Sequence, residues 1–189
     1  MERIRRFFES NYIAISEQDC LAFSSKLIRQ VFDKKTIILK RGQVENYVSF
    51  IEEGVVRYFV PKEHKELTIE LTFEGHLVGA YDSFLTRLPS IYHVEAIVKT
   101  SLWRISYEDV QILFRETAIG NAIGRLASEQ LFMEKASREL SLLNDTPEQR
   151  YLKLFTEQPD LIKRIPLQYI ASYIGITPQA LSRIRKRIS

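Results

Sequence analysis

The pattern of the chain changes near Ile105, and this change constrains the fold more than any other feature. Between about Val31 and Ile105, short runs rich in β-branched and aromatic residues alternate with turn residues, among them four glycines. After Ile105 the apolar residues recur at helical spacing. Seven or so short strands at such intervals are typical of a β-sandwich or barrel. We therefore expect an α+β chain in which an N-terminal β-barrel, of the jelly-roll or double-stranded β-helix kind, precedes a helical part.

The helical part is expected to contain one long helix that ends near Asn144. Ser106 and Asp109 stand at the spacing of an N-terminal capping pair. A helix of about 27 residues, roughly 40 Å long, would extend beyond a small barrel. We therefore expect its apolar stripe to form the seam of a homodimer, the alternative being that the helix packs on its own β-domain. The stripe repeats at intervals of seven and is widened by one more position: Ile119, Leu126, Met133 and Leu140, with Ile123.

The stretch "IPLQYIASYIGITPQALSRIRKRIS" has the spacing of two short helices joined by a tight turn. Ala171 is small enough for a second helix to cross closely. Gly175, four residues later, can end the first helix in the left-handed conformation. Thr177 then suits the cap of the second helix, and Pro178 suits its first position. Together these features predict a helix-turn-helix.

The outward face of the second helix has the chemistry of a DNA-binding surface. Residues 161–189 contain six basic and no acidic residues, whereas the remainder holds 21 basic and all 24 acidic ones. Glutamine can pair with adenine and arginine with guanine, while lysine and further arginines suit phosphates. The alternative is an ordinary solvated basic helix end. We expect double-stranded DNA to be contacted by Thr177, Gln179, Ser182, Arg183, Arg185, Lys186 and Arg187.

A hinge is expected between the long helix and this C-terminal part. Asn144 and Asp145 interrupt the helical pattern, and Thr146 and Pro147 then have the types preferred at the cap and first position of a new helix. The expected division of the chain is a barrel domain over 1–105, a helical linker with the dimerisation helix over 106–144, and a helix-turn-helix domain over 145–189.

In this order, the predicted elements resemble those of the Crp/Fnr family of bacterial transcription regulators along essentially the whole chain. The segment "GHLVGAYDSF" is similar to the phosphate-binding cassette of that family's cyclic-nucleotide-binding domain, with Gly75 and Gly79 at its two turn glycines. The segment "SIYHVEAIVKTSLWRIS" is similar to its closing strands. The segment "ALSRIRKRI" resembles its recognition helix, which implies base-reading roles for Gln179 and Arg183. The resemblance also implies that the barrel over 1–105 is a sensor domain and that the helix-turn-helix domain over 145–189 is of the winged-helix type. It further implies a homodimer, with DNA and RNA polymerase as partners and no membrane.

The chain departs from this family at the positions that hold cyclic AMP. Family members that bind it place a glutamate after the second cassette glycine, where this chain has Ala80. They pair the cyclic phosphate with an arginine, where this chain has Ser90, while Arg87 lies three residues earlier. A buried phosphate without a charged partner is costly, so we do not expect cyclic AMP in its usual pose, and we expect no cofactor. The pocket is open to two interpretations: it binds another ligand, or it is filled by Tyr81, Ile91 and Tyr92.

An enzyme is the alternative to a regulator, because cupin-type metal enzymes also have a β-barrel. Such a site needs paired histidines near a carboxylate, but His64, His76 and His93 are isolated in the sequence. The single cysteine, Cys20, excludes a cysteine-ligated iron–sulfur cluster within one chain. The start "MERIRRFFES" lacks the apolar core of a signal peptide, and we expect a cytoplasmic protein. The alternative function is therefore a β-barrel sensor or metal enzyme whose C-terminal hairpin contacts protein instead of DNA.

Overall fold

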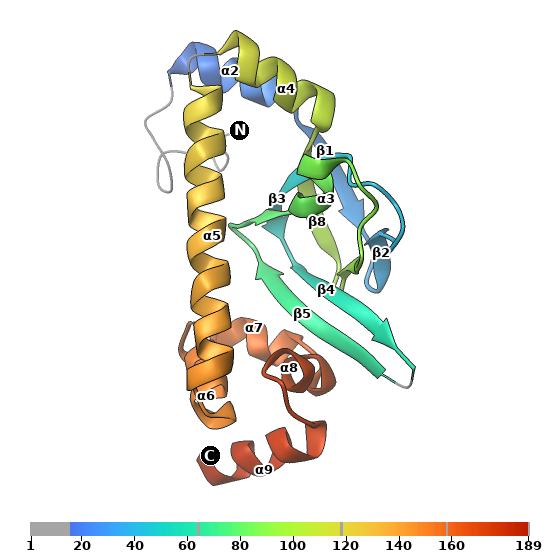
Figure 1. Cartoon of the computed structure of the whole chain (residues 1–189), viewed down its shortest axis with the longest axis vertical. Coiled ribbons are helices and arrows are strands. Elements are labelled where there is room, and N and C mark those ends of the chain that lie inside the picture. Colours follow the sequence, from blue (N-terminus) through green and yellow to red (C-terminus); the bar gives the residue numbers. More distant parts are fainter. Residues whose placement is uncertain (1–15, 64, 118, 158, 189) are drawn as a thin grey trace.

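Two four-stranded antiparallel sheets, stacked face to face, form the centre of the molecule (Figure 1). The computed structural model describes residues 16–63, 65–117, 119–157 and 159–188. One sheet has the strand order β1-β8-β3-β6 and the other β2-β7-β4-β5. The strands are β1 (Ile28–Phe32), β2 (Thr36–Leu39), β3 (Tyr47–Glu53), β4 (Val55–Lys62), β5 (Lys65–Phe73), β6 (Leu77–Val78), β7 (His93–Ala96) and β8 (Thr100–Ser106). The predicted β-rich N-terminal part is thus confirmed as a β-sandwich.

Strand β4 shows how the sandwich packs on both sides. Successive side chains of a strand point to opposite faces of the sheet. Val56 and Tyr58 point into the core between the sheets, whereas Val55 packs against the C-terminal helices. Both faces of β4 are therefore buried, which explains why apolar and polar residues do not alternate in its sequence. The core between the sheets consists of Phe32, Leu39, Ile51, Val56, Tyr58, Val78, Ala80, Val94, Ala96 and Leu102.

A short helix, α3 (Tyr81–Thr86), interrupts the segment that was expected to be a strand through "HLVGAY". Only Leu77 and Val78 pair with β3, as β6. Ala80 is fully buried in the sandwich core, so the chain turns there and leaves the sheet. A helix of six residues is too short to show a helical period in the sequence.

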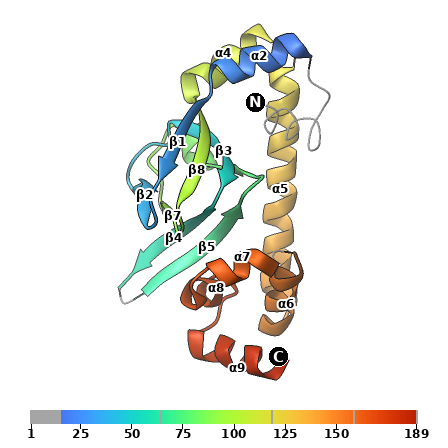
Figure 2. The same cartoon turned by 180° about the vertical axis from the view of Figure 1, so that it is seen from behind.

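Helices α2 (Glu17–Ser25) and α4 (Tyr107–Glu116) cover one end of the molecule (Figures 1 and 2). The predicted cap of α4 is confirmed, since the Ser106 hydroxyl accepts a hydrogen bond from the Asp109 amide at 3.1 Å. These helices form a small core with the start of α5 (Gly120–Asn144). Ile119 and Ile123 are buried in this core. The expectation that both belong to a dimer seam is therefore corrected, because their own chain already covers them.

The remainder of α5 runs along one side of the sandwich (Figures 1 and 2). Its 25 residues make a helix about 38 Å long. Leu126 is half-buried, whereas the second half of the helix carries large apolar side chains that are between 58% and 75% exposed. These are Phe132, Met133, Leu140 and Leu143, which we call the α5 stripe.

The C-terminal helices lie at the other end of the molecule, beside β5 (Figure 1). The predicted break at Asn144–Asp145 is confirmed, and so is the cap of the next helix. The Thr146 amide donates to the Gln149 side chain at 2.8 Å, and the Gln149 amide donates to the Thr146 hydroxyl at 3.3 Å. The helices are α6 (Pro147–Glu157), α7 (Pro159–Arg164), α8 (Leu167–Tyr173) and α9 (Pro178–Ile188). The described residues after Ser106 form helices and turns but no strand, so they do not contain the wing of a winged helix.

Candidate functional site

Helices α8 and α9 form a compact pair around a tight turn. Ala171 is fully buried between them, as are Ile174 and Leu181. Gly175 ends α8 with a φ of +82°, a left-handed conformation that a side chain would strain. The Thr177 hydroxyl caps α9 by accepting a hydrogen bond from the Ala180 amide at 3.2 Å. The two short helices and the tight turn expected for this stretch are thus present.

The outward face of α9 is basic and contains no acid. Each predicted DNA-contacting side chain is exposed except that of Ser182, which is half-buried. The Arg187 guanidinium is already engaged within the chain, because it forms an ion pair with Glu148 at the start of α6. The exposed members of the set are Thr177, Gln179, Arg183, Arg185, Lys186 and Arg187.

A hollow of about 300 Å³ lies between α9 and the start of α6. Its floor is apolar, and two arginines border it. Sequence reasoning did not find it, because Pro147 is 36 positions away from Arg183 along the chain. The lining residues are Pro147, Ile176, Ala180, Arg183, Ile184 and Arg187.

Helix α8 docks on the outer edge of strand β5. The Ser172 hydroxyl accepts a hydrogen bond from the Thr68 amide at 2.8 Å and donates one to the Glu66 carbonyl at 3.1 Å. Next to it, the Tyr173 hydroxyl donates to the Glu70 carboxylate at 3.4 Å, which also pairs with Lys135 of α5 at 2.5 Å. The orientation of α8 is therefore set directly by the sandwich.

Arg57 joins the same two parts of the molecule. Its side chain is fully buried, and its guanidinium lies between the rings of Phe59 and Tyr169, at 4.0 and 3.8 Å from their centroids. It pairs with the Glu66 carboxylate and, at 3.5 Å, with Glu95. Burial raises the pKa of Glu95, and the charge of Arg57 opposes that shift. Tyr169 belongs to α8 and Arg57 to β4, so α8 covers a buried guanidinium of the sandwich.

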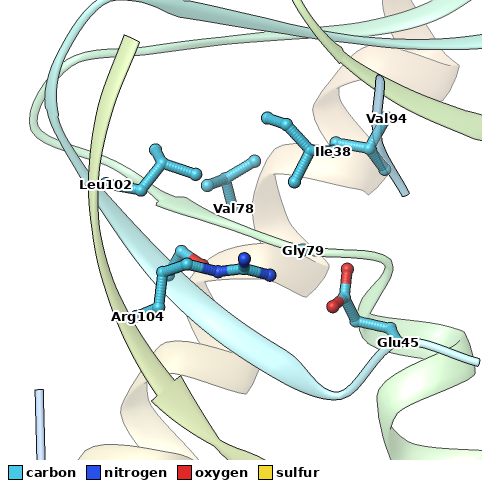
Figure 3. Close-up of a pocket in the computed structure, with 8 residues that line it drawn as sticks. Ile38, Glu45, Val78, Gly79, Val94, Leu102 and Arg104 are labelled. Carbon is cyan, nitrogen blue, oxygen red and sulfur yellow. The ribbon is translucent and has the colours of Figure 1, made fainter. Parts of the chain in front are cut away.

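A small cavity lies between the two sheets, beneath the segment that joins β6 to α3 (Figure 3). Its volume is about 10 Å³, which is close to the space that one water molecule needs. Two charged side chains, Glu45 and Arg104, border it and point toward each other across Gly79 in Figure 3. The other lining residues are Ile38, Ser49, Val78, Val94 and Leu102.

The structure brings only part of the predicted ligand pocket to this cavity. Gly79 lines it, and the Ala80 amide donates to the Glu45 carboxylate at 3.2 Å. Gly75 lies in the turn before β6, outside the lining. Tyr81 points to α5, where its hydroxyl is 3.1 Å from that of Ser128.

Two further expectations about the pocket are corrected. Ile91 is 67% exposed and therefore does not fill it. Ser90 is buried but bonds the Tyr92 carbonyl at 2.9 Å instead of lining the cavity. Arg87 turns toward the loop before β3, where it donates to the Glu45 carbonyl at 2.7 Å. The cause is that β7 begins only at His93, so that 87–92 form an irregular loop, from which Tyr92 packs against the core between the sheets.

Sequence reasoning missed both charged residues of the cavity. Glu45 lies in a loop, where a single acidic residue looks like an ordinary surface residue. Arg104 lies in "SLWRIS", a strand expected only to close the barrel. The one available signal was alternation in β8, since Leu102 and Arg104 must lie on the same face of the sheet.

The described part of the chain has neither a cluster of metal ligands nor a membrane-spanning helix. It contains no group of three or more histidine, cysteine or acidic side chains placed to hold a metal ion. His64 lies outside the described residues. None of the described helices is both long and apolar enough to span a bilayer.

Comparison with known proteins finds a family model that matches the sandwich and solved structures that share the fold of the whole chain. Residues 29–117 match the family model of the cyclic nucleotide-binding domain. A search by sequence among curated proteins found no match. Among solved structures, the c-di-GMP-responsive global regulator CLP of Xanthomonas campestris is similar at 17% identity, with a TM-score of 0.68 over 92% of this chain and 91% of CLP.

Two other solved structures show the same arrangement. A Eubacterium rectale protein described as a transcriptional regulator of the Crp/Fnr family is 15% identical, with a TM-score of 0.74 over 100% of this chain and 88% of its own. The catabolite activator protein of Thermus thermophilus is 20% identical, with a TM-score of 0.57 over 96% and 85%. The structural neighbours are thus Crp/Fnr regulators, and the expected resemblance is confirmed at the level of fold: a sandwich like that of the cyclic nucleotide-binding domain, a long helix and C-terminal helices.

Proposed function

We propose that this chain is a sequence-specific DNA-binding transcription regulator, in which α8, the turn at 174–177 and α9 are the helix-turn-helix. The observation that carries the proposal is the basic, acid-free outer face of α9, held by a core in which Ala171, Ile174 and Leu181 are fully buried. A solvated basic tail would need no such core. Helix α9 lies at the end of the molecule farthest from α2 and α4, so that the sandwich leaves its outer face uncovered (Figure 1).

The exposed side chains of α9 suit two parts of a DNA duplex, the base edges and the phosphate backbone. Gln179 and Arg183 are exposed one turn apart and suit base edges in the major groove. Lys186 is exposed one turn further and suits the phosphate backbone. Arg187 contributes less than its position suggests, because its ion pair with Glu148 must be weakened before it can bind a phosphate.

The regulator is proposed to act as a homodimer through the α5 stripe. Exposed apolar side chains along one long helix favour pairing with a second copy. Two α9 helices would then enter successive major grooves about 34 Å apart on a near-palindromic site. The separation depends on the α5–α6 hinge at 144–146 and on the docking of α8 against β5, so a shift at either place changes DNA affinity.

A second candidate is a protein-binding hairpin, and the hollow beside α9 favours it. An apolar floor bordered by Arg183 and Arg187 suits an acidic amphipathic segment of another protein. Its arginines, however, also belong to the face proposed for DNA. Binding of DNA and binding of such a segment would therefore exclude each other.

Selection of random-sequence duplexes on the purified chain, without added ligand, tests the proposal. The expected result is a two-fold symmetric consensus. Fluorescence anisotropy on that duplex should then give a log-affinity slope against log salt of about −4 per subunit, for four to five phosphate contacts. A chain that binds no duplex at low salt would leave the protein-binding candidate in first place.

Arg183→Ala and Arg125→Ala are the matched variants for this experiment. Arg125 is an exposed arginine on α5 that pairs with Glu129, so its loss removes the same charge far from α9. Arg183→Ala should reduce discrimination between the consensus and a mutated site by about 5- to 150-fold, the value of one bidentate base contact. Arg125→Ala should leave that ratio unchanged. Equal ratios for both variants would remove Arg183 from the base-reading residues.

A further inference from the structure

We propose that the cavity beneath Gly79 and Ala80 is an oxyanion site that the chain fills with its own Glu45 carboxylate, opposite the fixed charge of Arg104. In this view the sandwich already contains the anion that its interior requires. A phosphate-bearing ligand would have to displace Glu45 before it could enter. The proposal concerns the sandwich alone and does not depend on what α9 binds.

The carboxylate of Glu45 is held as a bound anion would be. The residue is only 3% exposed, although it lies in a loop. One carboxylate oxygen accepts a hydrogen bond from the Tyr47 amide at 3.0 Å, and the other accepts one from the Ala80 amide at 3.2 Å. Its own amide donates to the Ser83 hydroxyl at 3.1 Å. The backbone and the side chain of Glu45 are therefore both fixed to the segment around α3.

Gly79 makes this close approach possible. A Cβ atom at Gly79 would lie 2.9 Å from the Tyr47 carbonyl oxygen and 3.9 Å from the Glu45 carboxylate. The Gly79 amide is itself occupied, since it donates to the Tyr58 hydroxyl at 2.9 Å. The amide groups around the cavity are thus already used by protein atoms.

Arg104 supplies the opposite charge and retains one donor without a partner. Its side chain donates to Gln30 at 2.6 Å and stacks over the Tyr47 ring at 4.0 Å from the centroid. Its buried Nε has no hydrogen-bond partner among the described residues. Burial lowers the pKa of Arg104, and the charge of Glu45 opposes this shift. A buried guanidinium needs an anion nearby, and Glu45 is the acid that shares its cavity.

The size of the cavity excludes a second anion while Glu45 is in place. A volume of about 10 Å³ holds one water molecule but no phosphate or carboxylate group. A second negative charge beside the buried carboxylate would also be repelled. The closed sandwich should therefore bind neither a cyclic nucleotide nor inorganic phosphate.

Glu45→Ala should open the site to small oxyanions from solution. The variant leaves the Ala80 amide and the Arg104 guanidinium without their carboxylate, in a space enlarged by the lost side chain. Thermal unfolding is measured in sodium chloride, acetate and phosphate at matched ionic strength. We expect acetate and phosphate to raise the melting temperature of Glu45→Ala above its value in chloride, and this rise should saturate with salt concentration. The rise should be several degrees larger than the one seen for wild type.

Two variants control for charge and for the role of Arg104. Glu53→Ala removes an exposed acid from the end of β3, and its melting temperature should respond to the three salts as wild type does. Glu45→Ala combined with Arg104→Met should lose the selective response to acetate and phosphate. An equal response of the single and double variants would overturn the role of Arg104.

Wild type supplies a test that needs no variant. A saturable rise of its melting temperature with cyclic AMP or inorganic phosphate would overturn the proposal. If Glu45→Ala does not fold in chloride, refolding with acetate or phosphate should recover folded protein. Failure in all three salts would also count against the proposal. None of these readouts involves DNA, so their failure does not bear on the regulator function.

Discussion

Three tyrosines, one buried and two half-buried, each have a hydrogen-bonded hydroxyl in the folded chain. Tyr58 exchanges hydrogen bonds with the amide and carbonyl of Gly79 at 2.9 and 3.2 Å. Tyr92 donates to Asp82, and Tyr173 donates to Glu70. Burial raises the pKa of all three phenols above the ordinary tyrosine value.

These tyrosines predict a loss of stability at alkaline pH. An unfolded chain ionises its tyrosines near pH 10, whereas the fold keeps these three neutral. Their contribution to the free energy of unfolding is therefore fully present below about pH 10 and falls as pH rises further. Tyrosinate absorbance and far-ultraviolet circular dichroism should show the three phenols ionising only as secondary structure is lost. Ionisation of all nine tyrosines near pH 10 with the native spectrum retained would contradict this.

At the residue scale, the sequence predicted the caps but not the buried charges. Ser106, Thr146 and Thr177 each cap a helix as expected, because a cap needs only a few neighbouring residues. Glu45 lies in the loop before β3 and Arg104 lies in β8, so no local pattern shows that they border one cavity. The predicted DNA-contacting residues remain a prediction.

Helix α5 serves two purposes along its length. Its first turns close a core with α2 and α4, where Ile119 and Ile123 are buried. Its second half carries the exposed α5 stripe. The apolar residues recur every seven positions through both halves of α5. This spacing alone could not distinguish a residue that packs within its own chain from one that is available to a partner.

Charged substitutions in the α5 stripe should prevent dimerisation. Leu140→Glu places a charge in the proposed seam, where burial without a partner is unfavourable. Sedimentation should show wild type near 44 kDa, twice the 22.1 kDa of one chain, and the variant near 22 kDa. Leu21→Glu, at an equally exposed leucine on α2, is the matched control and should remain dimeric. A wild type that sediments near 22 kDa at micromolar concentration would contradict the predicted seam.

At the scale of the whole molecule, one apolar core joins the sandwich to the C-terminal helices. Val55, Leu71, Phe73 and Ile97 of the sandwich pack with buried residues of α6 and α8. Its buried members from the C-terminal part are Tyr151, Leu154, Ile165, Ile170, Ala171, Ile174 and Leu181. The sequence predicted the helix boundary at Asn144–Asp145, because element boundaries are visible in it, but not the packing of the C-terminal helices on the sandwich.

Ser172→Ala tests whether this docking stabilises the molecule. The variant removes the partners of the Thr68 amide and the Glu66 carbonyl, and it leaves the amide of a buried residue unpaired. We expect the free energy of unfolding to fall by about 1–3 kcal/mol in urea titrations. Hydrogen exchange at the Thr68 amide should also become faster. Ser25→Ala, at an exposed serine bonded only within α2, should change neither value. Unchanged exchange at Thr68 in Ser172→Ala would show that the docking hydrogen bonds do not protect it.

The position of β5 at the edge of its sheet has a consequence for the solubility of the chain. An uncovered edge strand offers its amides and carbonyls to any other strand, which is how many proteins begin to aggregate. Here a helix covers that edge, with one serine hydroxyl satisfying an amide and a carbonyl at once. The edge stays open until the last quarter of the chain has folded against it. The C-terminal helices therefore protect the sandwich from pairing with its own copies, whatever else they bind.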